Sequence, residues 1–155
     1  MWIDSKVDGI SLALAKYGKR ELDMLWLVKK FLGKKMNALD LGGNIGYYSI
    51  IMSKIIGSEG RLYVVEPDPR NTLLLKKNLL EYKNTKFYDC AIGNQNSEVE
   101  FNITEKSNLN TFVNLETIKK VEIKKVKMYK LETFINKIIK DEINFIRMDI
   151  EGFEY

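Results

Sequence analysis

The sequence predicts an α/β fold built on a parallel sheet, and two observations lead to this fold class. Short apolar runs of strand length alternate with longer helical segments, so that the first part of the chain reads strand, helix, strand, helix, strand. A glycine-rich turn at residues 42–46 joins the first run to the helix that follows it. Successive strands of a parallel sheet need helical crossovers of this kind, because the chain must return to the same end of the sheet.

Local signals mark the expected helices and strands in chain order. Asp68 and Pro69 begin one helix, since aspartate caps a helix N-terminus and proline suits the first helical position. An earlier helix ends at Gly33, in keeping with the preference for glycine just after a helix. The expected elements are a helix at 20–32, a strand at 37–41, a helix at 47–56, a strand at 61–66, a helix at 69–82 and a strand at 86–89.

The region 94–130 interrupts this alternation of strands and helices. Apolar residues alternate with polar ones around Phe101 and again around Ile123, which predicts two strands paired as an antiparallel hairpin. A short helix at 131–140 and a strand at 143–149 follow. With the parallel strands numbered in chain order, we expect the sheet order 3-2-1-4, with the hairpin inserted before the fourth strand.

Length and composition are those of one globular domain. The chain has 155 residues, of which 45% are hydrophobic and 30% charged, and lysines spread along it give a net charge of +4. We expect a single domain over 1–155, with residues 1–33 as an N-terminal helical cover. No apolar run reaches membrane-spanning length and the single cysteine, Cys90, fits a reducing compartment, so we expect the cytoplasm. The absence of histidine excludes a histidine general base, a histidine-containing zinc site and a Ser-His-Asp triad.

The glycine-rich turn is the first candidate ligand site. Gly42, Asn44 and Gly46 stand at alternate positions, with Gly43 between them and Asp40 two residues before the first. Glycine lets the backbone approach a ligand closely, and the N-terminus of the following helix offers N–H groups. The spacing differs from the G-x-G-x-x-G of dinucleotide-binding proteins and resembles motif I of the class I S-adenosylmethionine (SAM) methyltransferases. A glycine turn with no ligand is the alternative.

Two further candidates follow the second and third strands. Glu66 ends the second strand, twenty residues after Gly46, where an acid can accept the ribose hydroxyls of a nucleoside cofactor. Asp89 follows the third strand and, with the backbone near Ala91, is placed to meet an adenine ring. A surface glutamate beside a turn and a turn-capping aspartate are the respective alternatives.

Asp149 and Glu151 close the fourth strand, two residues apart, so their side chains leave an extended chain on the same side. In the order 3-2-1-4, the first and fourth strands are neighbours. Asp40, the glycine turn and Asp149 then converge at the switch point where ligands of such sheets bind. Asp40, Glu66 and Asp149 would make this crevice acidic, which favours the sulfonium and ammonium groups of SAM over the pyrophosphate of NAD.

Several motifs in register resemble the FkbM-type methyltransferases, over about residues 8–155. The family usually has alanine where Gly43 stands, a change that we expect to leave the turn intact. The resemblance implies a Rossmann-like class I methyltransferase fold and SAM-dependent O-methylation of a hydroxyl on a sugar, glycan or natural product. The segments that carry it are Asp40–Tyr48, Val65–Pro69, Ala91–Gly93, Ser107–Leu109 and Phe145–Glu154.

The resemblance also implies roles for the candidate residues. It puts the glycine turn at the methionine and ribose part of SAM, and Asp149 and Glu151 at the catalytic edge. In a chain without histidine, these two carboxylates are the candidate bases for the hydroxyl proton. A divalent metal on these two carboxylates is the lesser alternative, and we expect none, because two ligands in sequence do not make a metal site. The candidate cofactor-binding residues are Asp40, Gly42, Gly43, Asn44, Gly46, Glu66, Asp89 and Ala91.

One departure from the family concerns the sheet. The resemblance to class I methyltransferases implies a sheet of seven strands. This chain stops inside the motif at 145–154, before the family's strands 5, 6 and 7. We therefore expect a fragment of a longer protein, with its C-terminal strands missing and without activity on its own.

Three other functions stay open on the sequence: a nucleic-acid methyltransferase, a non-catalytic nucleotide-binding module and a nicotinamide dehydrogenase. Residues 148–151 stand where amino-group methylases carry an Asp/Asn-Pro-Pro-Tyr motif, and no dense basic stripe is interleaved with aromatic residues. Both observations count against nucleic acid, and the partner that the resemblance implies is a small-molecule or glycan hydroxyl acceptor. Neither the acceptor nor the oligomeric state follows from the sequence.

Overall fold

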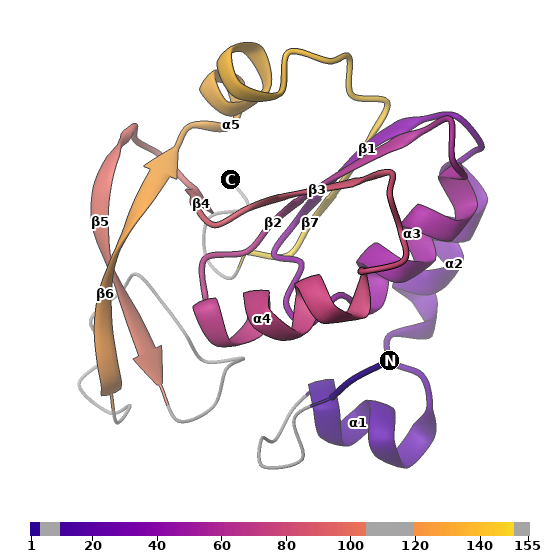
Figure 1. The fold of residues 1–155 in the computed structure, drawn as a ribbon, viewed down its shortest axis with the longest axis horizontal. Helices are drawn as coiled ribbons and strands as arrows, with labels where there is room; N and C mark the ends of the chain where they lie inside the picture. Colours follow the sequence, from indigo (N-terminus) through magenta and orange to yellow (C-terminus); the bar gives the residue numbers. More distant parts are fainter. Residues whose placement is uncertain (4–9, 105–119, 151–155) are drawn as a thin grey trace.

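The computed structural model describes residues 1–3, 10–104 and 120–150, and its centre is a four-stranded parallel sheet (Figure 1). The strands are β1 (Asn37–Leu41), β2 (Arg61–Val65), β3 (Thr85–Tyr88) and β7 (Phe145–Met148). Their order is β3-β2-β1-β7, and every neighbouring pair is parallel. The predicted fold class and the predicted order 3-2-1-4 are confirmed.

Helices cover both faces of this sheet (Figure 1). One face carries α2 (Leu22–Phe31), α3 (Tyr47–Ile56) and α4 (Pro69–Asn78), and α1 (Ile10–Tyr17) lies on the outer side of that layer. The other face carries α5 (Leu131–Thr133) and the π-helix η2 (Phe134–Ile139). The helices α2, α3 and α4 lie where the sequence predicts them, although α4 ends earlier than expected.

The helix predicted at 131–140 takes a wider form than an α-helix. It continues from α5 into η2, where the Lys140 N–H donates to the Ile135 carbonyl, five residues back. The wider turn brings Phe134 and Ile139 to the same face, and both side chains are buried against the sheet. The hydrophobic periodicity of the sequence does not reveal this wider hydrogen-bond pattern, because the pattern depends on which side chains pack against the sheet.

Alternating side chains on the strands separate two apolar layers. Ala38, Leu62 and Val64 pack with the layer formed by α2, α3 and α4. Leu39 and Tyr63, one position away, pack with the cluster that contains η2. Such two-sided burial is expected of a parallel sheet, because crossover helices cover its faces.

A second sheet of three strands stands beside the first (Figure 1). Strands β5 (Ser97–Thr104) and β6 (Lys120–Tyr129) are antiparallel, which confirms the predicted hairpin. The short strand β4 (Ala91–Ile92) pairs with β6 in parallel, a contact that the sequence did not predict. The chain therefore leaves the main sheet at β3 and enters the second sheet within a few residues.

The glycines of the turn after β1 make room for the protein's own chain. Gly42 has φ +81°, and a Cβ there would lie 2.0 Å from the carbonyl oxygen of Asp149. A Cβ on Gly43 would lie 2.3 Å from Cγ1 of Val64. The space that the sequence assigned to a ligand at these two glycines is thus filled by the continuation of β7 and by a side chain of β2. An alanine at Gly43 would need Val64 to move, so glycine fits this chain at the position where the family usually has alanine.

We predict that Gly42→Ala destabilises the protein more than Gly18→Ala. Both glycines have positive φ, +81° and +67°, but the space around Gly18 is open. A non-glycine residue in this region costs about 1–2 kcal/mol, and the clash at Gly42 adds roughly 1–3 kcal/mol of overpacking. Urea unfolding of both variants measures the difference, and equal losses of free energy would show that Asp149 does not occupy this space.

Candidate functional site

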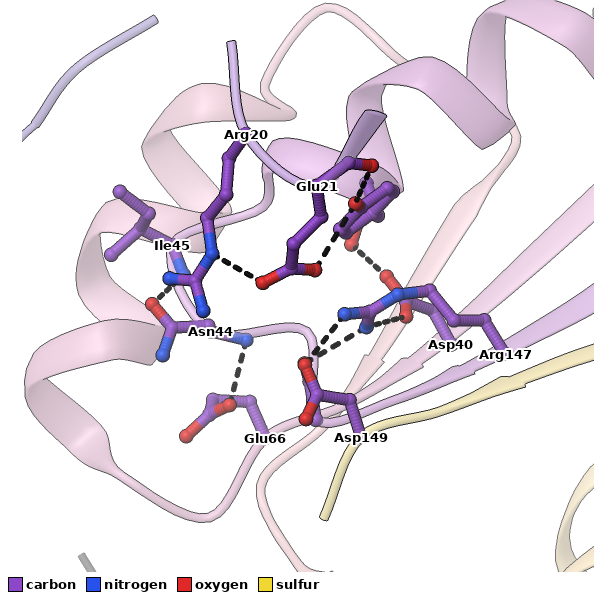
Figure 2. A network of polar contacts seen from close by, with 11 residues as sticks. Arg20, Glu21, Asp40, Asn44, Ile45, Glu66, Arg147 and Asp149 are labelled. Carbon is purple, nitrogen blue, oxygen red and sulfur yellow. Dashed lines mark hydrogen bonds and ion pairs between the residues drawn. The ribbon is translucent and has the colours of Figure 1, made fainter. Parts of the chain in front are cut away.

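The carboxyl ends of β1, β2 and β7 meet at one edge of the sheet, and the predicted site residues Asp40, Asn44, Glu66 and Asp149 lie there (Figure 2). Asp40 of β1 lies opposite Arg147 of β7 in the parallel register. The chain winds away from β1 in both directions, towards β2 and towards β7. Such a switch point is where open α/β sheets bind their ligands.

Asp40 lies beneath this edge and does not line its surface. Its side chain is completely buried, and its carboxylate accepts hydrogen bonds from Ser49 Oγ (2.6 Å) and from Arg147 Nη1 (2.9 Å). Both oxygens are therefore bound by the protein itself. This corrects the expectation that Asp40 borders the crevice: it holds β1, α3 and β7 together below the site.

Arg147 is the central site residue that the sequence analysis missed. Only 6% of it is exposed, and its Nη2 donates to Oδ2 of Asp149 at 2.8 Å. Its guanidinium carbon lies 4.2 Å from the centre of the Tyr48 ring, a cation–π contact. A signal was available, because an arginine that is buried within a strand of the sheet must find partners of opposite charge.

Arg147 also changes the charge of the crevice from the value expected. The charges of Asp40, Arg147 and Asp149 add up to one negative charge. The side chain of Asp149 is 45% exposed, so the remaining charge lies at the surface. The crevice is less acidic than three unpaired carboxylates would make it, and charge alone no longer decides between SAM and NAD.

Glu66 ties the glycine turn to the turn that precedes α4. Its Oε2 accepts from the backbone N–H of Asn44 at 2.7 Å, and its Oε1 accepts from the N–H of Asp68 at 3.0 Å. Only 6% of the residue is exposed. Burial raises the pKa of Glu66 to about 7, although the backbone donors of Asp68 and Asn44 and the Asn71 amide, 3.4 Å from Oε1, oppose this shift. Glu66 is therefore a buried carboxyl with too few donors for its environment.

The backbone N–H groups of the glycine turn are already used within the chain. Those of Gly42 and Gly43 both donate to the Val65 carbonyl at 3.0 Å, and that of Gly46 donates to the Gly43 carbonyl. Gly46, with φ +93°, begins α3. These amides fix the shape of the turn, so a ligand at this edge must rely on other groups.

The two residues expected at an adenine lie in different surroundings. Asp89 follows β3 and is exposed, and its carboxylate pairs with Lys76 of α4 at 3.0 Å. The preceding residue, Tyr88, accepts from the N–H of Glu66, so Asp89 lies near the end of β2. Ala91 is buried in the second sheet. An adenine amine would have to compete with Lys76 for Asp89.

Two N-terminal residues reach the same network (Figure 2). The Tyr48 hydroxyl donates to the carbonyl and to the carboxylate of Glu21, both at 3.2 Å, and Arg20 pairs with that carboxylate. Burial and the nearby Glu21 raise the pKa of Tyr48, which keeps its hydroxyl protonated. No pattern in the sequence pointed to Glu21, because its contact depends on how α2 packs on α3.

The second predicted catalytic residue, Glu151, lies outside the described residues. Within the described ranges, no group of three or more Asp, Glu, Cys or His side chains is arranged to hold a metal ion. No helix among the described residues is long and apolar enough to span a membrane.

The sequence from residue 40 to residue 155 matches the methyltransferase FkbM domain. The chain belongs to the FkbM methyltransferase family. The match begins at Asp40 and includes the glycine turn, Glu66 and the end of β7, which are the elements that form the edge described above. A search of the curated proteins finds no match.

Several solved methyltransferases are similar to parts of this FkbM chain. A protein-L-isoaspartate O-methyltransferase shares 29% identity over 42% of this chain and 22% of its own, with a TM-score of 0.39. A SAM-dependent methyltransferase from Aquifex aeolicus shares 27% identity over 41% of this chain and 36% of its own, with a TM-score of 0.38. Aeropyrum pernix fibrillarin, solved with SAM bound, shares 28% identity over 52% of this chain and 31% of its own, with a TM-score of 0.38. The aligned part of this chain spans less than half of each of these proteins.

We predict that Glu66 makes the stability of the protein fall as the pH rises. Its pKa is raised from 4.5 to about 7 on folding, so its contribution is fully present below pH 4.5 and is lost as the pH passes about 7. A shift of this size corresponds to about 3 kcal/mol. Urea unfolding at pH 5 and pH 8 should show this loss in the wild type, relative to Glu66→Gln. Identical pH dependence in the two proteins would contradict the burial of an ionisable group at this position.

Proposed function

We propose that this protein is a SAM-dependent methyltransferase that methylates a hydroxyl group. The observation that carries the proposal is the FkbM domain match over residues 40–155. A hydroxyl on a sugar, glycan or natural product is the acceptor class that the family resemblance implies. Residues 148–151 also lack the Asp/Asn-Pro-Pro-Tyr motif of amino-group methylases, which supports oxygen over nitrogen as the acceptor atom.

Glu66 is the best support for a nucleoside at this edge. A carboxylate has about four lone-pair positions, and donors that bind it favour its ionised form. Glu66 accepts two backbone N–H groups and a long hydrogen bond from the Asn71 amide, and its pKa is still about 7, so burial outweighs these donors. A pair of ribose hydroxyls would supply the missing donors. In this proposal, Glu66 binds the ribose of SAM, and Asp89 binds the adenine amine in competition with Lys76.

Asp149 is the residue that favours binding of the cationic end of SAM. Its carboxylate is exposed at the end of β7, beside the glycine turn, and the buried pair below it leaves one negative charge at this place. SAM carries a sulfonium and an ammonium group, which a carboxylate attracts. This interaction places the methionine part of SAM across the ends of β1 and β7.

The proposed reaction requires the site to orient the acceptor hydroxyl and to remove its proton. When bound, SAM supplies a methyl group activated by its sulfonium. The site would hold the acceptor oxygen in line with that methyl group, and such positioning contributes on the order of 7–11 kcal/mol in favourable cases. The acceptor loses its hydroxyl proton as the new bond forms. We propose Asp149 and Glu151 as the groups that accept it.

Binding and turnover test this proposal separately. Calorimetric titration with SAM and with NAD should give binding of SAM alone. Incubation with methyl-labelled SAM and a panel of sugars and small alcohols should then give a labelled ether. Binding of NAD but not SAM would indicate a dehydrogenase, and SAM binding without transfer to any hydroxyl would indicate a non-catalytic module.

We predict that SAM binds more tightly at pH 8 than at pH 6 because of Glu66. If ribose hydroxyls bind only its ionised form, apparent affinity follows the ionised fraction, which rises from about 0.1 to about 0.9 around a pKa of about 7. The expected gain is therefore about tenfold. Titration of Glu66→Gln at both pH values corrects for the ionisation of SAM itself. An equal gain in the variant would show that Glu66 does not contact the ribose.

A further inference from the structure

Arg147 occupies a position that the proposed function leaves unexplained. It lies on β7 between two carboxylates, with Nη1 on Asp40 at 2.9 Å and Nη2 on Asp149 at 2.8 Å. The Tyr48 ring covers the guanidinium, and Arg147 Nε has no hydrogen-bond partner among the described residues. The side chain is thus fixed on three sides, and its one unpaired nitrogen shows that hydrogen bonding alone did not dictate its place.

Charge alone does not explain this arginine in a site that binds a cation. Burying a guanidinium is costly, and its positive charge reduces the attraction that Asp149 exerts on a sulfonium. Removing Arg147 would leave two negative charges in place of one, and electrostatics alone would then bind SAM more tightly. The presence of Arg147 in the site therefore calls for a geometric role.

The geometry of the guanidinium supplies such a role. Its donors form a rigid planar fork, so a group that fixes one Nη also fixes the direction of the other. Asp40 is completely buried and holds Nη1, and the Tyr48 ring sets the plane. The direction of Nη2 is then determined, and with it the position of the exposed Asp149 carboxylate that it binds.

We propose that Arg147 is a positioning residue, which holds the Asp149 carboxylate against the cationic methionine end of SAM. Asp40 and the Tyr48 ring act through Arg147 and do not touch the ligand. This inference rests on the proposed function, since it names the part of SAM that Asp149 meets. It predicts that loss of Arg147 weakens the binding of SAM, although the site becomes more negative.

The test compares SAM with S-adenosylhomocysteine, which has the same nucleoside and amino acid but no sulfonium charge. All variants carry Asp40→Asn, which keeps one oxygen to accept from Arg147 Nη1, because Arg147→Met alone would leave a buried carboxylate unpaired. In this background, Arg147→Met and Asp149→Asn should each lower the preference for SAM over S-adenosylhomocysteine by about three- to tenfold. Together they should lower it no further than either alone, because Arg147 acts through Asp149.

The outcomes separate this inference from its rivals. A merely structural role would weaken both ligands equally, and a purely electrostatic role would raise the preference for SAM in Arg147→Met. Either result overturns the proposal, as does a combined effect equal to the product of the single effects. If the wild type binds neither ligand, the proposed function fails as well. If the wild type prefers SAM and Arg147→Met in the Asp40→Asn background keeps that preference, only this inference fails.

Arg61→Met is the matched control. Arg61 also pairs with an aspartate, Asp141 at 3.0 Å, but it stands at the amino end of β2 and its side chain is 56% exposed. Its removal should leave both affinities unchanged. Circular dichroism and thermal melting confirm that each variant is folded before titration.

Discussion

A buried ion pair between Asp40 and Arg147 joins the central strand β1 to its neighbour β7, at the end of the strands where the site lies. The two residues are 107 positions apart in the sequence and adjacent in the register of β1 and β7. Asp40 is completely buried and Arg147 almost so, which makes the pair costly to form and costly to break. The rest of the edge depends on it, because β7 must approach β1 closely enough for the carboxylate and guanidinium to meet.

That close approach explains the glycine turn and the position of Asp149. The backbone N–H of Asp149 donates to the Leu41 carbonyl, and its carbonyl oxygen lies where a Cβ of Gly42 would stand. The turn is then closed from the other side by Glu66, which accepts from the N–H of Asn44. Two of the acids that the sequence assigns to a ligand therefore shape the site itself: both carboxylate oxygens of Asp40 are bound by the protein, and Glu66 also accepts backbone N–H groups. Such fixed surroundings favour binding and catalysis, because little reorganises when a ligand arrives.

Local pattern was enough to predict the sheet and most of its helices. Strand order followed from the handedness and spacing of crossovers, and the alternation around Phe101 and Ile123 marked the hairpin. The pairing of β4 with β6 was beyond such reasoning, because a strand of two residues, Ala91–Ile92, is too short to show a periodicity. The sequence predicted which acidic residues lie at the site, but not what each of them does there. Asp40, Glu66 and Asp149 were identified, but Arg147 was not, since its partners depend on strand register.

The most direct test of this account is the coupling between Asp40 and Arg147 in the free energy of unfolding. Asp40→Asn, Arg147→Met and the double variant would be unfolded in urea beside the wild type. Removal of one partner of a buried pair costs about 3–5 kcal/mol, and we expect Arg147→Met to lie in this range. The double variant should lose much less than the sum of the two single variants, since neither charge is then left unpaired. Additive losses would show that the two residues do not depend on each other, and that the edge is held together by something else.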